Sequence, residues 1–395
     1  MTTLQDICLQ ITDGKHGDCQ NEEGSGYYFV SCKDVKDGWV DYSSARQITE
    51  EDYLDAHRRT RLEPDDILIT NSGTIGRITL VPSATETGRT TFQKSVAILK
   101  PRKESVIPRW LYYYLVARRV ELIAWAGGTA QKNLLLRDLR AFKVFEPPLS
   151  TQRKIAAVLS AYDNLIENNL RRIKILEAIA QLIYREWFVN FRFPRHEKVR
   201  MVESPVGKVP KGWGVMTLGE VADVRWGDTS TTKQEYTADG YDAYSASGLD
   251  GKLSHFDYER DGIVLSAIGA NCGVTWFARG KWSCIKNTIR FWSIRPEVSN
   301  EYLFLLTRQP DFWKRRGSAQ PFISQGDAQE SVIIISDPDI MKVFTMLVKP
   351  CLAKADLHRR VNLNLRRTRD LLLPKLISGE LDVSELDIDM EGTRQ

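Results

Sequence analysis

The sequence predicts an α+β fold with two similar domains separated by a long antiparallel two-helix coiled coil. Two repeated stretches are the first observation behind it. Gly128-Thr129-Ala130-Gln131 returns as Gly317-Ser318-Ala319-Gln320, and Asn169-Leu170-Arg171-Arg172 returns as Asn364-Leu365-Arg366-Arg367. The second observation is that the same order of segments surrounds each copy: an aromatic-rich mixed stretch, then a proline, then a long helix. Such a repeat indicates a duplicated structural unit.

The first domain is predicted at residues 1–148, where short β-like runs precede a helix. The runs at 66–70 and 95–99 are bounded by Gly, Pro and Asn, and a glycine turn lies between them. Pro108 opens a helix that we expect to reach about Ala124. Strands followed by helices fit an α+β domain better than a doubly wound parallel sheet.

A first long helix is predicted at residues 149–192. There is no Gly or Pro from Ser150 to Trp187, and two stripes repeat every seven residues, which is typical of a coiled coil. About 38 residues at ~1.5 Å each make a helix ~55 Å long. A helix of this length cannot bury its apolar stripe on a small domain, so it needs a long partner.

The second half of the chain repeats the order of the first. A linker rich in charge, Pro and Gly leads to a second mixed domain, and a second long helix follows Pro338. Pro350 is expected either to kink that helix or to mark its start. The predicted segments are 193–213 for the linker, 214–338 for the second domain, 339–380 for the second long helix and 381–395 for an acidic tail.

The two long helices are expected to pair with each other. Antiparallel pairing is favoured, because parallel pairing needs a linker that doubles back along the whole rod. A seam asparagine in each helix would fix the register at some cost in stability, and a loosely packed seam is the alternative. The residues assigned to the seam and to partner contacts are Ile155, Leu159, Tyr162, Ile166, Asn169, Ile173 and Leu176 in the first helix, and Val361, Asn364, Leu365 and Leu372 in the second.

Composition excludes several classes of protein. A hydrophobic content of 42% and ten tryptophans support real cores, which excludes a disordered chain. No apolar run approaches the ~18 residues of a membrane span, and no secretion signal opens the chain. The six cysteines show no CxxC, so we expect a reduced, cytoplasmic protein. Cys8, His16, Cys19 and Cys32 match no common zinc spacing, so no metal site is predicted.

Charge is distributed unevenly, although the net charge of +4 is small. Residues 340–379 contain nine Lys or Arg against two acidic residues, whereas residues 380–395 contain six acidic residues against one Arg. The acidic tail is most simply a solvated terminus.

Basic residues beside aromatics and glycine turns are candidate DNA contacts in both domains. Lys and Arg neutralise phosphate, and Arg, Asn or Gln read base edges. The alternative for each of them is a solvated surface charge over a buried aromatic. The candidates are Lys15, His16, Arg77, Lys94 and Lys132 in the first domain, and Arg225, Lys233, Lys281, Lys286, Arg315 and Arg316 in the second.

Three motifs, in order around the duplicated domain, resemble the specificity subunit of Type I restriction-modification systems. Pro147-Pro148-Leu149-Ser150-Thr151-Gln152-Arg153-Lys154-Ile155 resembles the central conserved helix of that family. Gly207-Lys208-Val209-Pro210-Lys211-Gly212-Trp213 resembles the entry to its second target-recognition domain, and the stretch 372–381 resembles its C-terminal conserved helix. The second repeat departs modestly, with Ser336-Asp337-Pro338 where the first has Glu146-Pro147-Pro148.

The resemblance implies a non-catalytic subunit that reads a bipartite sequence in double-stranded DNA, one half-site per domain. It implies docking of two modification subunits, which bind S-adenosylmethionine and methylate adenine, and of ATP-driven, Mg²⁺-dependent restriction subunits. The chain itself is expected to carry no cofactor. A ~55 Å rod spans about one and a half turns of B-DNA at ~34 Å per turn, which suits two half-sites.

Two alternatives from other classes remain. The chain lacks an Asn-Pro-Pro-Tyr or Asp-Pro-Pro-Tyr tetrapeptide and a GxxxxGK[ST] loop, which disfavours a free-standing methylase or helicase. A Mg²⁺-dependent nuclease with its own specificity domains would use Asp6, Asp13 and Lys15, since an acid pair holds the metal and a lysine steadies the water. A coiled-coil adaptor without a DNA role is the weaker alternative.

Overall fold

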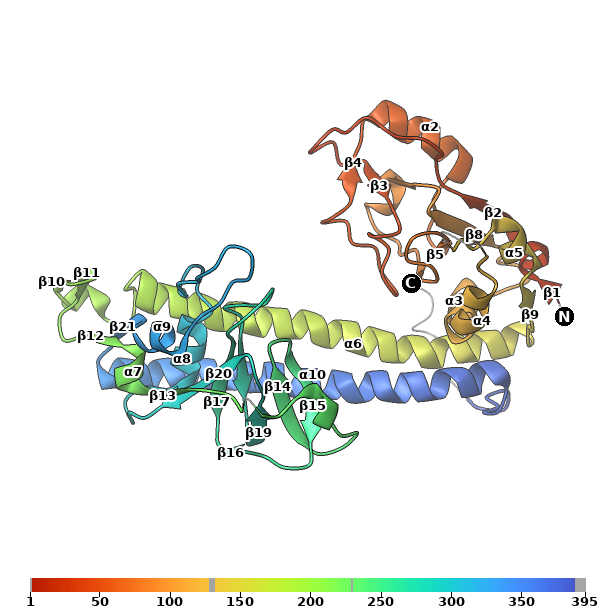
Figure 1. Ribbon diagram of the computed structural model, residues 1–395. Coiled ribbons are helices and arrows are strands. Elements are labelled where there is room, and N and C mark those ends of the chain that lie inside the picture. Colours follow the sequence, from red (N-terminus) through yellow and green to blue (C-terminus); the bar gives the residue numbers. More distant parts are fainter. Residues whose placement is uncertain (1, 128–131, 229, 388–395) are drawn as a thin grey trace. The chain divides into compact units, whose positions relative to one another are not determined.

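The computed structural model describes residues 2–127, 132–228 and 230–387, and divides into two units (Figure 1). The first unit comprises Met1–Asn168 and Asn362–Gln395, and the second comprises Asn169–Val361. Each unit therefore contains one globular domain together with a part of each long helix. The first member of the predicted repeat, residues 128–131, lies outside the described residues.

The domain of the first unit is built on two small sheets. The larger has the antiparallel order β2-β8-β5-β6, and the smaller has the order β4-β3-β7, in which β3 and β7 are parallel. A short pair, β1-β9, closes the domain. The strands are β1 Thr2–Thr3, β2 Cys8–Asp13, β3 Tyr28–Val30, β4 Arg46–Gln47, β5 Ile67–Thr70, β6 Ile78–Leu80, β7 Thr90–Phe92, β8 Val96–Pro101 and β9 Lys143–Val144. The helices are α1 Leu4–Ile7, α2 Glu50–Thr60, η1 Thr87–Arg89, α3 Pro108–Ala117, α4 Arg119–Ala124 and α5 Leu136–Ala141.

The domain of the second unit repeats this architecture. Here both sheets have four strands: one has the order β13-β20-β17-β18, and the other, β15-β14-β19-β16, again contains a parallel pair, β14 with β19. The strands are β12 Gly214–Thr217, β13 Ala222–Trp226, β14 Tyr241–Ser245, β15 Gly248–Leu253, β16 Tyr258–Glu259, β17 Gly262–Ser266, β18 Thr275–Ala278, β19 Lys281–Cys284, β20 Thr288–Ser293 and β21 Val332–Ile335. The helices are α7 Leu218–Val221, η4 Lys233–Glu235, α8 Asn300–Leu306 and α9 Gln325–Gln329.

The two long helices pair antiparallel within each unit. They are α6, Leu149–Tyr184, which continues into the π-helical turn η2, Arg185–Val189, and α10, Pro338–Ser378. In the first unit the beginning of α6 shares a core with the end of α10, since Ile155 and Leu159 cluster with Leu373 and Leu376. In the second unit the end of α6 meets the beginning of α10, where the rings of Tyr184 and Phe344 are 6.4 Å apart. The predicted α+β fold with an antiparallel helix pair is confirmed.

The seam of α6 follows the predicted heptads. Ile155, Leu159, Ile166 and Ile173 are buried, as is Asn169, whereas Tyr162 and Leu176 are half-buried. A gap-free run of good helix formers with apolar residues every three or four positions explains both the length of the helix and its buried face.

The register of α10 differs from the predicted one. The buried positions are Met341, Phe344, Val348, Leu352, Ala355, Asn362, Leu373 and Leu376. Val361 and Asn364 are exposed, and Leu365 and Leu372 are half-buried. The predicted seam residues belong to a second apolar stripe of this helix, which lies outside the buried positions. α10 also runs through Pro350 without a break, so this proline neither starts nor ends it.

The predicted linker and tail are partly folded. Residues 193–213 contain η3, His196–Lys198, and a hairpin of β10, Met201–Ser204, with β11, Gly207–Pro210. Phe193 and Trp213 are buried and their ring centroids are 5.1 Å apart. At the other end of the chain Val383 is buried, and the carbonyl oxygen of Ser384 accepts a 2.5 Å hydrogen bond from Lys154 Nζ. The start of the acidic tail is therefore packed against the first unit rather than solvated.

Candidate nucleic-acid interface

Five loops gather at one end of the sheets in each domain. They are joined by backbone hydrogen bonds at equivalent places, so the same construction appears twice. We define the first loop cluster as residues 14–27, 31–45, 71–77, 93–95, 125–127 and 132–135. The second loop cluster comprises residues 227–228, 230–240, 246–247, 267–274, 285–287 and 307–324.

Lys94 and Lys286 occupy equivalent turns at the centre of these clusters. In the first domain Gln93, which precedes Lys94, donates its backbone N–H to the carbonyl oxygen of Val30 in β3 at 2.9 Å. In the second domain Ile285, which precedes Lys286, donates its N–H to the carbonyl oxygen of Tyr244 in β14 at the same distance. The carbonyl oxygen of the residue after each lysine accepts from the loop that follows β5 or β17, at 3.0 Å in both. Both lysines are exposed, and neither ammonium contacts an acidic side chain in the described parts of the chain. Each domain therefore presents an unneutralised cation where its loops converge.

A tight backbone approach fixes the first loop of each cluster. A Cβ atom at Gly14 would lie 1.9 Å from the carbonyl oxygen of Phe92, and one at Gly227 would lie 2.7 Å from that of Cys284. Only glycine allows the first loop to come this close to the strand that leads to the lysine turn. The duplicated glycine thus explains why the loop and the lysine lie side by side.

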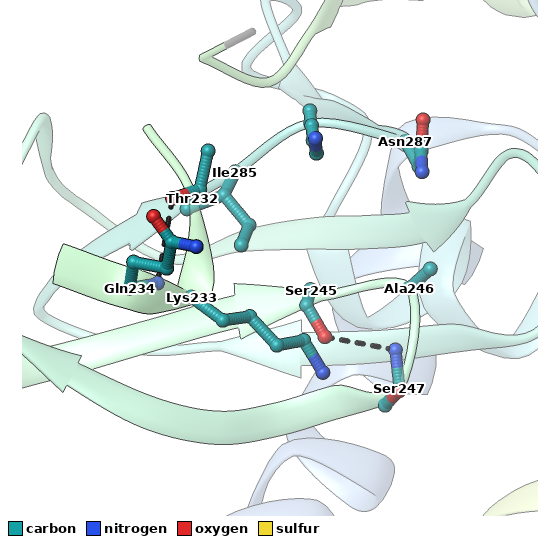
Figure 2. A pocket seen from close by; sticks show the side chains of 9 residues that line it. Thr232, Lys233, Gln234, Ser245, Ala246, Ser247, Ile285 and Asn287 are labelled. Atoms are coloured by element: carbon teal, nitrogen blue, oxygen red, sulfur yellow. Dashed lines mark hydrogen bonds between the residues drawn. The ribbon is translucent and has the colours of Figure 1, made fainter. Parts of the chain in front are cut away.

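The second loop cluster lines an open cavity of about 390 Å³ (Figure 2). Most of the lining side chains end in a hydroxyl, an amide or an ammonium group. The amide of Asn or Gln matches the edge of adenine, and the ammonium of Lys matches that of guanine. The lining residues are Thr232, Lys233, Gln234, Ser245, Ala246, Ser247, Ile285, Lys286 and Asn287.

Electrostatics distinguish the two lysines of this cavity. Lys233 forms an ion pair with Asp250, whose carboxylate also accepts hydrogen bonds from Ser245 at 2.7 Å and Tyr236 at 2.9 Å. Burial opposes the ionisation of Asp250, but the hydrogen bonds from Lys233 and the two hydroxyls outweigh it and lower its pKa. Lys233 is thereby held by a stable carboxylate, which leaves Lys286 as the cation available to a ligand.

The first loop of the second cluster is held by another carboxylate. Asp228 accepts hydrogen bonds from the hydroxyl of Ser230 at 2.6 Å and from the hydroxyl of Thr231. These contacts lower the pKa of Asp228 to about 2, because they stabilise its ionised form. The loop that carries Lys233 is therefore anchored at its base.

The predicted contacts of the first domain fall into two groups. Lys94 and Lys132 are exposed. Lys15 is engaged by Asp52 at 3.0 Å and Asp55 at 3.2 Å, and the hydrogen bond to Asp52 is the main cause that raises its pKa to about 12.

Two further candidates of the first domain also have partners. The Nε2 atom of His16 lies 3.0 Å from a carboxylate oxygen of Asp13. The guanidinium of Arg77 donates to the carbonyl oxygen of Val35 at 3.1 Å and to that of Cys32 at 3.4 Å. Arg77 thus supports the loop 31–45 rather than extending into solvent.

The predicted contacts of the second domain are also divided. Lys233, Lys286, Arg315 and Arg316 belong to the second loop cluster, and Arg316 forms an ion pair with Asp327. Two other candidates lie outside it. Arg225 is on strand β13, 2.9 Å from Asp223, and Lys281 begins β19, at the opposite end of that strand from the lysine turn and 3.6 Å from Glu259.

Sequence reasoning missed two residues of these clusters. Asn287 follows Lys286 with a φ of +66°, a left-handed conformation that Asn tolerates better than most side chains. Trp39 is 55% exposed in the loop 31–45 of the first cluster. The dipeptide Asp37-Gly38 before it is a hairpin-turn signal that would have located it.

The long helices expose large apolar side chains away from their seam. On α6 and η2 these are Leu165, Leu170, Ile175, Ile179, Leu182 and Val189. On α10 they are Val343, Met346, Leu347, Leu357, Val361, Leu363 and Leu371. Within the α6 set, Ile175, Ile179 and Leu182 are separated by four and then three residues, which is the spacing of one helix face. Each helix therefore has a second apolar face beyond its seam.

The described residues contain no cluster of metal ligands and no membrane-spanning helix. No three His, Cys, Asp or Glu side chains of those residues converge in a way that would hold a metal ion. The six cysteines are free. None of the helices in the described part of the chain combines the length and apolarity needed to cross a membrane.

Known proteins share both the sequence pattern and the fold. The family model for the Type I restriction modification DNA specificity domain matches residues 3–178 and 210–344 of this chain. The MjaIX specificity subunit of a Type I restriction enzyme from Methanocaldococcus jannaschii is 25% identical over 347 residues, which cover 81% of this chain and 78% of that protein. The HindI specificity subunit from Haemophilus influenzae is 21% identical over 368 residues, covering 72% and 80%.

A solved structure shows the same fold. The S subunit of a Type I restriction-modification system from M. genitalium superposes with a TM-score of 0.64 at 17% identity, covering 95% of this chain and 94% of that one. Because the family model matches both globular domains and parts of both long helices, the chain belongs to the family of Type I restriction modification DNA specificity proteins.

Proposed function

We propose that this chain is a non-catalytic subunit that binds double-stranded DNA and reads a bipartite target. The observation that supports it most directly is the duplicated loop cluster, with Lys94 and Lys286 exposed at equivalent turns. Two separate domains with the same construction suit two short half-sites. Their different loop sequences suit two different half-sites, because base edges are read by side chains rather than by the fold.

The loop chemistry supports readout of bases in addition to binding of phosphate. The cavity of the second cluster places Gln234 and Asn287 with Lys286, and these amides and this ammonium are the groups that discriminate purines in the major groove. Arg315 on a neighbouring loop and Lys132 in the first cluster are exposed cations suited to phosphate.

The apolar outer faces of α6 and α10 support a docking role. Large side chains such as Ile175, Leu182 and Leu357 are 58% to 59% exposed, and helices of a partner would bury them at a gain of about 25 cal/mol per Å². In this proposal two modification subunits, which methylate adenine, and ATP-dependent restriction subunits dock on the chain. S-adenosylmethionine, ATP and Mg²⁺ then act in those partners.

The candidate residues of the alternative nuclease have other roles. The carboxylate of Asp6 accepts from the backbone N–H of Thr3 at 2.8 Å and caps α1. Asp13 is an ion-pair partner of Arg59, and Lys15 is held by carboxylates of α2. Three residues that are engaged with separate partners do not form an acid pair with a poised lysine.

Selection from a pool of randomised duplexes tests the proposal. The full chain, with its modification subunit, is expected at physiological salt to enrich two short motifs separated by a spacer of fixed length and free sequence. Equal binding to all duplexes would contradict DNA reading. Incubation of the chain alone with DNA and Mg²⁺ tests the alternative, since cleavage that is lost in Asp13→Ala would favour a nuclease.

A further inference from the structure

Trp39 is displayed at the end of a tight hairpin in the first loop cluster. The side chain is 55% exposed, although burying a tryptophan is strongly favourable. The neighbouring Val35 is fully buried, and Lys36 donates its backbone N–H to the carbonyl oxygen of Trp39 at 2.9 Å. Gly38 has a φ of +85°, as the turn requires. The backbone is therefore ordered up to Trp39, whose side chain nonetheless projects into solvent.

Contacts on several sides hold this hairpin in place. The buried carboxylate of Asp34 accepts from the backbone N–H of Ser31 at 2.9 Å and from the hydroxyl of Ser44 at 3.1 Å. Asp37 forms a two-pronged ion pair with Arg119, with N–O distances of 2.6 and 3.0 Å. These contacts pre-organise the hairpin, so presenting the indole to a ligand costs little conformational entropy.

Two further anchors place the hairpin beside the other loops of the cluster. Gly38 donates its backbone N–H to the carbonyl oxygen of Ile78 at 3.0 Å, and Arg77 donates to the carbonyl oxygen of Val35 at 3.1 Å. The backbone N–H of Cys32 donates to the hydroxyl of Ser95, which follows Lys94, at 3.1 Å. The indole thus belongs to the same loop cluster as the central lysine.

The charges around Trp39 suit an anionic ligand. Lys33 is exposed and Lys36 is half-buried, with its ammonium donating to the carbonyl oxygen of Lys33 at 2.6 Å. The nearest carboxylate along the chain, that of Asp37, is neutralised by Arg119. An aromatic ring flanked by cations matches a nucleobase beside its phosphates.

We infer that Trp39 is a stacking residue of the first domain, which packs its indole against a base step that opens when the target duplex binds. The inference rests on the proposed DNA-reading function and adds to it a distortion of the DNA. Apolar side chains that enter between base pairs unstack them locally and kink the duplex. Unstacking depends on the sequence of the step, so Trp39 would contribute to selectivity at a position without hydrogen-bond readout.

The connection of the second domain that is equivalent to the Trp39 hairpin carries no such aromatic side chain. The equivalent connection, between β14 and β15, is only Ala246 and Ser247, where Ser247 donates its N–H to the hydroxyl of Ser245 at 3.0 Å. No aromatic side chain stands in this short turn. The distortion is therefore expected in one half-site only, which provides an internal control.

The test uses the full chain and a duplex of the sequence that the wild-type chain selects from a randomised pool. 2-Aminopurine replaces adenines in each half of the target in turn, because its fluorescence rises when it is unstacked. Affinity and fluorescence are measured for wild type, Trp39→Ala and Trp39→Phe. Phe145→Ala is the matched control, since Phe145 is 62% exposed in the same unit but follows β9, outside the loop cluster.

Trp39→Ala is expected to bind the target about 10-fold to 100-fold more weakly and to lose the fluorescence rise in one half-site. Trp39→Phe should keep most of both signals, and Phe145→Ala should match wild type. Unchanged affinity and fluorescence in Trp39→Ala would overturn the inference while leaving DNA reading intact. The inference would also be overturned if Trp39→Ala bound DNA as tightly as wild type but no longer bound the modification subunit. A wild-type chain without any preferred sequence would overturn the proposed function itself.

Discussion

Asn362 donates a hydrogen bond from Nδ2 to the backbone carbonyl oxygen of Ile166, at 3.2 Å, between the two long helices of the first unit. Asn362 is only 4% exposed, so its amide is buried in the seam. A buried polar side chain is satisfied only in the register that supplies its partner. This hydrogen bond therefore ties the pairing of α6 and α10 to one alignment.

Substitution of the two asparagines of α10 tests that alignment. Asn362→Ala should lower the free energy of unfolding by about 1–2 kcal/mol, because it removes a buried hydrogen bond and leaves a small void. Asn364→Ala should change it by less than about 0.5 kcal/mol, since Asn364 is exposed. Urea denaturation followed by circular dichroism measures both. A larger effect at Asn364 would place the seam where the sequence predicted it.

The two helices show how far heptad patterns predict packing. In α6 the apolar residues of the seam are large and regularly spaced, and the prediction for Ile155, Leu159, Ile166 and Ile173 matches the buried face. In α10 the seam includes the small Ala355 and the polar Asn362, while large apolar side chains lie outside it. Sequence periodicity detects apolar faces, but it does not say which of two faces is buried within the chain.

Substitution of the central lysines tests the duplicated readers. Lys94→Ala and Lys286→Ala should each weaken binding of the selected duplex by about 1–3 kcal/mol and relax selectivity in a different half of the target. Lys281→Ala is the control, because Lys281 lies at the far end of β19 from the lysine turn and near Glu259. Fluorescence anisotropy with duplexes altered in either half measures the effect. Relaxation of both halves by one substitution would argue against separate readers.

The positions of the interface loops can be predicted from the sequence. It is harder to predict which lysine and arginine side chains in those loops have no acidic partner. Lys94 and Lys286 stand in turns that a glycine- and polar-rich pattern marks as loops. Lys15 looks equally basic, but Asp52 and Asp55 reach it from a helix about 40 residues further along the chain. Pairing between residues so distant in sequence depends on the tertiary fold, so a single sequence does not reveal it.

Two buried thiols, one in each domain, give a pH-dependent test of the domain cores. Burial raises the pKa of Cys8 and of Cys284 to about 12, because the thiolate would lack solvation. The stability that these protonated thiols give the folded protein is fully present below about pH 8.5, the pKa of a cysteine in the unfolded chain. It is lost as the pH rises toward about 12.

Alkylation measures this protection. Between pH 7 and pH 9, iodoacetamide should label the partly exposed Cys32 and Cys351 and leave Cys8 and Cys284 unmodified, as peptide mass spectrometry can show. Cys284 ends the strand before the lysine turn, so its rapid labelling would mean that the packing beneath this turn is loose.

The outer face of α6 is expected to bind a partner. The double substitution Ile175→Glu and Leu182→Glu should reduce co-purification of the modification subunit by about tenfold or more, because both side chains are 59% exposed and would be buried on docking. Its thermal midpoint should stay near that of wild type. Ile173→Glu, in the seam, should instead lower the midpoint. Normal co-purification of the double variant would exclude this face as the docking surface.

An exchange of one domain tests most directly whether each domain reads its own half of one target. Methylated adenines are mapped across the genome of cells that carry the complete system, with either the wild-type chain or a chain whose residues 214–337 come from another member of the family. We expect the methylated motif to keep one half and its spacer while the other half changes. A motif that stays the same, or one that changes in both halves at once, would contradict this expectation.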